Sequence, residues 1–262
     1  MRQKTSTLGR HVRPYALGVI ALAGVTLAGA WLTALGRGAP IGFSELVFWI
    51  GMAFVAELFW LDNARGEGMV SMASAVNIAT IALLPLELLT AVTALSVLAS
   101  DRGLRQRSML RSSFNAGQSV LAVTAGWFAL HALGGSSLSA ATPAIASDPL
   151  PITIAIGCFW LVNTGLVSGV VALDHGRSIG EIWRGHYANL AYGQTFAALA
   201  AIGLLLVGAT QSFGLIAAPL SIALFLVTRE AHRGWTSRAR SLRGGEGDLA
   251  RDGGSDRERI AS

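Results

Sequence analysis

Apolar stretches separated by short polar segments dominate the chain, and one of the longest without a charge covers residues 151–173. As a helix at about 1.5 Å per residue it would be about 35 Å long, enough to cross a hydrocarbon core of about 30 Å. Gly165 and Gly169 form a GxxxG pair within it, which lets a second helix approach closely, and Asn163 lies on a different face. We therefore expect this helix to lie inside a bundle, with the rest of the chain organised around it.

A short amphipathic segment follows this helix. Ser178 and Glu181 have the spacing of a capping box, which predicts the start of a helix. The apolar and aromatic residues of the segment fall on one face: Ile179, Ile182, Trp183, His186, Tyr187 and Leu190. This pattern predicts a helix that lies flat at the membrane interface, with Trp183 as an interfacial anchor.

The pattern as a whole predicts an all-α, polytopic transmembrane bundle of about eight membrane segments. The predicted segments are residues 15–35, 41–61, 69–84, 86–100, 116–133, 151–173, 190–209 and 213–227. Segments 69–84 and 86–100 are short and are divided by Pro85, so they form two full spans, a re-entrant hairpin or one long kinked helix. With a hairpin, the bundle has six full spans.

The positions of the basic residues favour an even number of crossings. With eight crossings and an internal N-terminus, every one of the 20 Lys and Arg residues except Arg37 lies on the cytoplasmic side. A single crossing over residues 69–100 would place the arginines after residue 100 outside. We therefore expect both termini in the cytoplasm, a basic N-terminal tail (1–14), a transmembrane domain (15–235) and a polar, disordered C-terminal tail (236–262).

Composition supports this class and leaves few signs of catalysis. The chain is 52% hydrophobic and only 13% charged, which is typical of a polytopic membrane protein. Its net charge of +5 follows from topology, so we expect no nucleic-acid partner. A single cysteine, Cys158, excludes an intrachain disulfide and a cysteine-based metal site. No HExxH, nucleophile-elbow or P-loop motif occurs, so we expect no catalytic residues, metal or cofactor, and no enzyme.

Two stretches carry a family resemblance: residues 109–135 (MLRSSFNAGQSVLAVTAGWFALHALGG) and 159–187 (FWLVNTGLVSGVVALDHGRSIGEIWRGHY). They resemble a bacterial integral-membrane region that stands N-terminal to cyclic-di-GMP signalling domains of the GGDEF or HD-GYP (metal-dependent phosphohydrolase) type. The shared marks are a polar cluster opening a helix (Phe114, Asn115, Gln118), the Asn163–Thr164 pair, and the turn and surface helix at 176–183. The resemblance covers about residues 66–235. It implies a membrane-embedded sensory or ligand-binding module. Because no output domain follows the last predicted helix, the module would act through a separate partner.

Polar groups inside predicted spans are the candidate ligand contacts, because they are costly in a bilayer. Glu45, Glu87 and His131 lie near the external ends of predicted spans. They form an acidic mouth that attracts a cation or a basic ligand, with Trp49 as a stacking wall, or they simply reach interfacial water, and the second interpretation is favoured. Deeper residues on three helices, Asn77, Asn163 and Gln194, form a polar pocket or hydrogen-bond one another as interhelical contacts, the latter being the more frequent outcome.

A cluster of arginines follows the fourth predicted segment: Arg102, Arg105, Arg107 and Arg111. One interpretation is that these residues are a topological anchor, which explains them without further assumption. The other is that, together with Trp183, they form a docking surface for anionic lipid or for a cytoplasmic partner.

The favoured function is a sensory or small-ligand-binding module in the bacterial cytoplasmic (inner) membrane, acting with a cytoplasmic signalling protein. The alternative is a small-molecule permease or the substrate-binding subunit of a transporter. Oligomerisation is left open.

Overall fold

The computed structural model describes residues 11–38, 42–62, 69–135, 149–231 and 234. The predicted C-terminal tail (236–262) lies outside the described residues, as does most of the predicted N-terminal tail.

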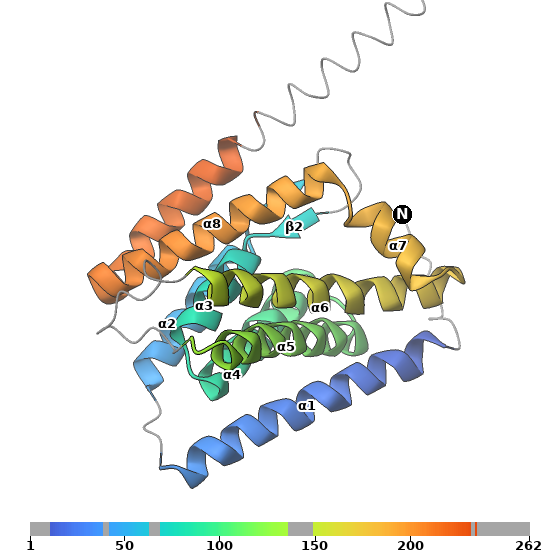
Figure 1. The fold of residues 1–262 in the computed structure, drawn as a ribbon, viewed down its shortest axis with the longest axis horizontal. Coiled ribbons are helices and arrows are strands. Elements are labelled where there is room, and N and C mark those ends of the chain that lie inside the picture. Colours follow the sequence, from blue (N-terminus) through green and yellow to red (C-terminus); the bar gives the residue numbers. More distant parts are fainter. Residues whose placement is uncertain (1–10, 39–41, 63–68, 136–148, 232–233, 235–262) are drawn as a thin grey trace, which may run out of the picture.

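Helices make up nearly all of the described chain (Figure 1). They are α1 (Val12–Gly36), α2 (Phe43–Ala56), α3 (Ala73–Leu83), α4 (Leu86–Ala99), α5 (Met109–Ala132), α6 (Leu150–His175), α7 (Ile179–His186) and α8 (Leu190–Phe213). A π-helix, η1 (Ser100–Leu104), extends α4, and a 3-10 helix, η3 (Gly214–Ile216), joins α8 to a helical segment at residues 217–231. A short antiparallel ladder, β1 (Trp60–Asp62) with β2 (Met69–Ser71), connects α2 to α3.

The predicted helical class is confirmed, whereas the predicted span count is only partly supported. Three described helices, α1, α6 and α8, are long and apolar enough to cross a membrane. The second and third predicted segments correspond to shorter apolar helices, α2 with 14 residues and α3 with 11. Fewer than eight clear spans are therefore present in the described part of the chain.

The core of the bundle surrounds α3, not α6 as the sequence suggested. Eight of the 11 residues of α3 are buried, and α2, α4, α5, α6, α8 and the segment 217–231 all contribute to the same apolar core. Helix α6 is buried along one face only, and on its other side Leu161 is 52% exposed. The difference arises because a helix that is apolar all round is favourable against lipid and against protein alike, so hydropathy does not tell the two apart.

Pro85 separates α3 from α4 and excludes the single kinked helix. Leu84 and Pro85 are both extended, and Pro85 serves as the N-cap of α4. The Trp127 indole nitrogen of α5 donates to the Leu84 carbonyl oxygen at 3.2 Å, which satisfies an acceptor that the proline break leaves free. The chain therefore turns back on itself at this point.

Close helix crossings depend on glycines that face backbone. A Cβ on Gly126 of α5 would lie 3.0 Å from the Ala155 carbonyl oxygen of α6, and one on Gly203 of α8 would lie 2.7 Å from the Ala75 carbonyl oxygen of α3. The predicted Gly165–Gly169 pair acts through one member only. Gly169 faces the Tyr15 ring, whereas a Cβ on Gly165 would meet nothing within 4 Å, because α1 crosses α6 beyond that position.

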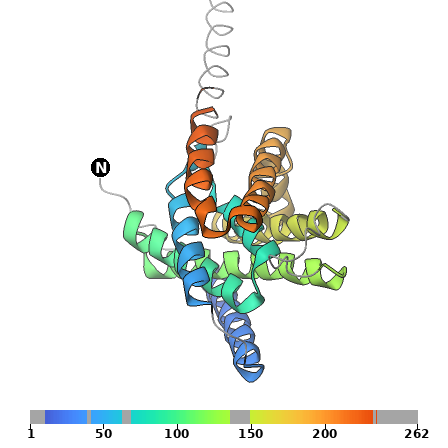
Figure 2. The same cartoon turned by 90° about the vertical axis from the view of Figure 1, so that its left-hand side faces the viewer.

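One end of the bundle, which we call the arginine end, gathers the starts of α1 and α5 with the ends of α2, α4 and α6. The ring of Tyr15 in α1 packs at a tilt against the ring of Phe114 in α5, with the centroids 6.2 Å apart, and the Tyr15 hydroxyl donates to the Leu166 carbonyl oxygen of α6. Glu57, directly after α2, pairs with Arg105, directly after η1. Helix α1 lies at the edge of the molecule in both views (Figures 1 and 2).

Candidate ligand-binding cavity

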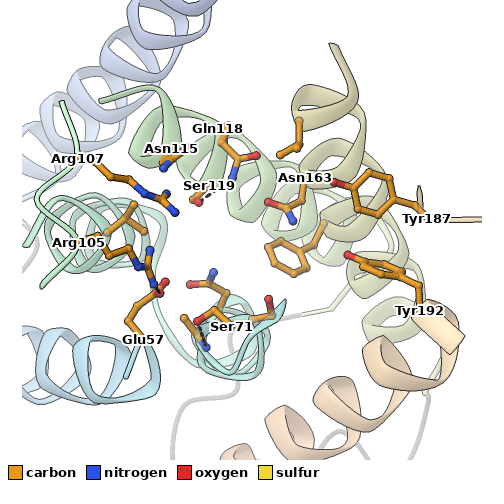
Figure 3. A pocket seen from close by; sticks show the side chains of 16 residues that line it. Glu57, Ser71, Arg105, Arg107, Asn115, Gln118, Ser119, Asn163, Tyr187 and Tyr192 are labelled. Atoms are coloured by element: carbon orange, nitrogen blue, oxygen red, sulfur yellow. Dashed lines mark hydrogen bonds and ion pairs between the residues drawn. The ribbon is translucent and has the colours of Figure 1, made fainter. Parts of the chain in front are cut away.

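A polar cavity of about 260 Å³ opens inside the bundle near the arginine end (Figure 3). Its walls come from α3, α5 and α6, from the segment that follows α4, and from the connection between α7 and α8. The walls differ in chemistry: one carries charges, one carries neutral amides and hydroxyls, and one is aromatic.

Asp101 organises the charged wall from just behind the cavity. Its side chain is completely buried, and it accepts hydrogen bonds from Arg105 Nη1 at 2.7 Å and from Asn115 Nδ2 at 2.6 Å. Arg107 Nη1 lies 3.3 Å from Asp101 Oδ1. Arg105 also donates through Nη2 to Glu57, which is 8% exposed. Two carboxylates thus face two guanidinium groups, and the wall carries no net charge.

The backbone after α4 turns these side chains inward. The π-helical turn brings the Arg105 amide to the Ser100 carbonyl oxygen at 3.2 Å, and the Arg107 amide then donates to the Asp101 carbonyl oxygen at 3.0 Å. Between them, Gln106 adopts a left-handed conformation with φ of 49°. This tight loop folds the arginines back over Asp101 before α5 begins.

The predicted arginine docking surface is therefore divided. Arg105 and Arg107 are half-buried and paired with acids, so they do not form part of an exposed surface. Arg102 and Arg111 are exposed. Charge counting places all four residues on one side of a membrane but carries no information on which of them face inward.

The neutral wall brings together residues from three helices. Asn77 of α3, Gln118 and Ser119 of α5, and Asn163 of α6 all line the cavity. Two of the three deep residues expected to converge therefore do so, whereas Gln194 is exposed on α8. Among the described residues, the side chains of Asn77 and Asn163 make no hydrogen bond to each other or to another protein group, and Gln118 Oε1 is buried without a partner.

The aromatic wall consists of Tyr187, Tyr192 and Phe159. The two tyrosine rings meet edge to face at 4.9 Å, one at the end of α7 and the other in the first turn of α8. Burial raises the pKa of Tyr187 above its usual value. The sequence pattern placed Tyr187 on the face of a surface helix and gave no indication of a role for Tyr192. The available signal was a pair of tyrosines flanking the turn between an amphipathic helix and an apolar one.

Helix α7 packs back on α6 and so brings Tyr187 to the cavity. The predicted cap is present, since Ser178 Oγ accepts from the Glu181 amide at 3.2 Å. Ile182 is buried, and the Trp183 indole nitrogen donates to Thr164 Oγ1 at 2.9 Å. Trp183 is therefore half-buried and held within the bundle by this hydrogen bond, because the turn at Gly176 directs α7 back along α6.

The remaining predicted contacts lie at the opposite end of the bundle. Glu45 and Glu87 are in the first turns of α2 and α4, and both helices end near the cavity. His131 is in the last turn of α5, where its ring stacks on Trp127 at 3.7 Å. Trp49 is buried in the core, so it offers no open stacking wall. The expected single ligand set is thus separated into two groups.

The cavity offers hydrogen-bond donors and acceptors beside aromatic faces. No group of three or more His, Cys, Asp and Glu side chains arranged to hold a metal ion occurs among the described residues. The chain matches no protein-family model, no curated protein and no solved structure in the three comparisons. The physical properties of the cavity are therefore the basis for a functional proposal.

Proposed function

We propose that this chain is a multi-pass membrane protein that binds a small, uncharged, polar ligand in the cavity and acts as a sensory module. The observation that carries the proposal is the pair of amides from Asn77 and Asn163, which face one cavity without hydrogen-bond partners among the described residues. Interhelical contacts would pair such groups with each other. Both side chains are half-buried and line the cavity, so a ligand or water there can take the hydrogen bonds that the protein does not supply.

Charge balance supports an uncharged ligand. Glu57 and Asp101 already neutralise Arg105 and Arg107 within the protein. A charged ligand would have to give up its hydration without meeting an unpaired opposite charge, which is expensive in a site of low dielectric. Neutral hydroxyls and amides can instead be matched by the two asparagines, Gln118 and the tyrosines.

The size and the surroundings of the cavity support a compact ring-bearing molecule. A volume of about 260 Å³ is near the lower limit for small-molecule sites. Phe159 and the tyrosines supply apolar ring faces, and the amides supply directional hydrogen bonds. A small polyol, sugar or cyclic amide has these properties.

A sensory role is favoured over transport by the packing beyond the cavity. Towards the end of the bundle where α3 meets α4, the side chains of Ile81, Leu84, Leu89 and Leu130 are buried in a continuous apolar core. A polar solute would need a path through that layer to cross. The resemblance to membrane regions of cyclic-di-GMP signalling proteins also favours signalling, and a cytoplasmic partner would then contact the arginine end.

A thermal-shift screen on the purified full-length protein tests this proposal. Neutral polyols, sugars and cyclic amides are compared with charged analogues of similar size. A ligand at a hundred times its Kd should stabilise the fold by about 2.7 kcal/mol. The stabilisation should vanish in Asn77→Ala and Asn163→Ala and persist in Gln194→Ala, which changes an exposed amide outside the cavity.

Three results would contradict the proposal. If charged analogues stabilise the protein and neutral ones do not, the charge argument is wrong. If the asparagine variants bind as well as the parent, the cavity is not the site. Accumulation of the stabilising solute by proteoliposomes would replace the sensory role with transport.

We further propose that the protein resides in a bacterial cytoplasmic membrane with the arginine end inside, following the distribution of basic residues. Single cysteines at Ser108 and Ser44, both exposed and at opposite ends, can be compared in a Cys158→Ala background. In intact cells an impermeant thiol reagent should label Ser44→Cys and spare Ser108→Cys. The reverse pattern would invert the proposed orientation.

A further inference from the structure

A second hollow, which we call the α1 groove, lies between α1, α5 and α6 at the arginine end. Its volume is about 280 Å³. The starts of α1 and α5 and the end of α6 meet there, so polarity can be followed from the helix ends inward.

Polarity changes along the groove in one direction. At the helix ends, Arg111 and Asp174 are exposed and His175 lies beside them. About one helical turn further in, Phe114 and Val170 line the groove. A groove that is charged at the end of the bundle and apolar towards its middle has the polarity of a phospholipid lying along a membrane helix.

The charges at the mouth favour an anionic headgroup. Arg111 has no ion-pair partner among the described residues, whereas Arg107 also lines the groove but is paired with Asp101 at 3.3 Å. Other exposed arginines at this end, Arg102 and Arg177, add to the positive potential. Asp174 is the one acid in the lining, and it can accept from a headgroup hydroxyl.

We infer that the α1 groove binds one anionic glycerophospholipid, with its phosphate at Arg111 and an acyl chain along Phe114 and Val170. Basic pockets between membrane helices are a common way of holding such headgroups. A lipid explains both halves of the groove, since free phosphate would leave the apolar half uncovered. It also fits the neighbouring outer face of α1, where Leu17 and Leu22 are exposed.

Native mass spectrometry of the purified full-length protein, with phosphatidylglycerol titrated in a neutral detergent, tests the inference. One phosphatidylglycerol should be retained at concentrations where phosphatidylcholine is not. Arg111→Gln should weaken its binding about fivefold, as expected for one arginine near a membrane surface. Arg184→Gln, which removes an exposed arginine of α7 outside the groove, should leave binding unchanged.

A second variant addresses the acyl chain. Val171→Phe should fill part of the groove and release the lipid without changing charge. If Val171→Phe does not fold, as judged by its melting temperature without lipid, the comparison of Arg111→Gln with Arg184→Gln alone tests the inference. Competition by glycerol phosphate or inorganic phosphate should be weak, because neither contacts the apolar half.

Several outcomes would overturn the inference. Equal loss of binding in Arg111→Gln and Arg184→Gln would indicate diffuse surface attraction. Tighter binding of phosphatidylethanolamine than of phosphatidylglycerol would show that Asp174 selects an ammonium group. Full competition by inorganic phosphate would show that no acyl chain is held. Retention of an amphipathic peptide in place of lipid would assign the groove to a protein.

Discussion

An Asp101→Asn substitution removes one negative charge from a completely buried side chain and leaves its size nearly unchanged. The parent carboxylate accepts from Arg105 at 2.7 Å and from Asn115 at 2.6 Å, with Arg107 at 3.3 Å. The variant keeps one acceptor oxygen and gains an NH₂ group. That group must face a donor, so at least one of these contacts becomes repulsive.

The cost can be worked from these contacts. Two charge-assisted hydrogen bonds are worth about 1.5–3 kcal/mol each, and removing one partner of a buried ion pair costs about 3–5 kcal/mol. Both estimates give a loss of about 4 kcal/mol in the free energy of unfolding. At about 2–4 °C per kcal/mol for a chain of this size, the melting temperature should fall by about 8–16 °C.

Thermal unfolding in detergent, scanned at one fixed rate, provides the measurement. Asp174→Asn is the matched control, because Asp174 is exposed and has no ion-pair partner among the described residues. Its melting temperature should change by less than about 2 °C. Combining Asp101→Asn with Arg105→Gln should cost less than the sum of the two single changes, since both single changes remove the same Asp101–Arg105 contact.

A shift of less than about 3 °C for Asp101→Asn would refute the reasoning. It would mean either that water reaches the carboxylate or that the arginines find other acceptors at little cost. An additive double variant would show that Asp101 and Arg105 are not coupled.

Three further predictions concern packing and titration. Gly203→Ala should destabilise the fold by about 1–3 kcal/mol because its Cβ would lie 2.7 Å from a carbonyl oxygen of α3, whereas Gly208→Ala, with open space, should be neutral or stabilising in thermal scans. Trp183→Phe should cost about 1 kcal/mol by losing its hydrogen bond to Thr164, and a Thr164→Val background should reduce that cost. Because burial raises the pKa of Tyr187 above 10.0, the folded state keeps this proton at pH values where the unfolded chain loses it. The stability from this group is full below about pH 10 and falls above it, and Tyr187→Phe should remove that part of the alkaline loss.

Features that depend on local spacing could be predicted from the sequence. The apolar lengths of α1, α6 and α8 are sufficient to identify candidate spans. Ser178 and Glu181 predicted the start of α7, and the cap is present at 3.2 Å. The break at Pro85 followed from the missing amide hydrogen of proline. Each of these features is set by residues within a few positions of one another.

Features that depend on the direction in which a side chain points within the bundle could not be predicted. Asn77 and Asn163 were recognised as costly polar groups, but only packing determines that they share a cavity while Gln194 does not. The inward turn of Arg105 and Arg107 rests on a π-helical turn and on a left-handed Gln106, neither of which has a sequence signature. The same limit explains the choice of α6 as the central helix.

The burial of α3 has a consequence for how the protein is made. This helix has 11 residues, about 16 Å, which is roughly half a bilayer, and a large part of its surface is covered by α8, far downstream in the chain. When α3 leaves the ribosome its final neighbour has not been synthesised. We expect α3 and α4 to enter the membrane together as a provisional hairpin and to take their final positions only when α8 arrives. A nascent chain that stops before Leu190 should therefore be a substrate for membrane quality-control proteases.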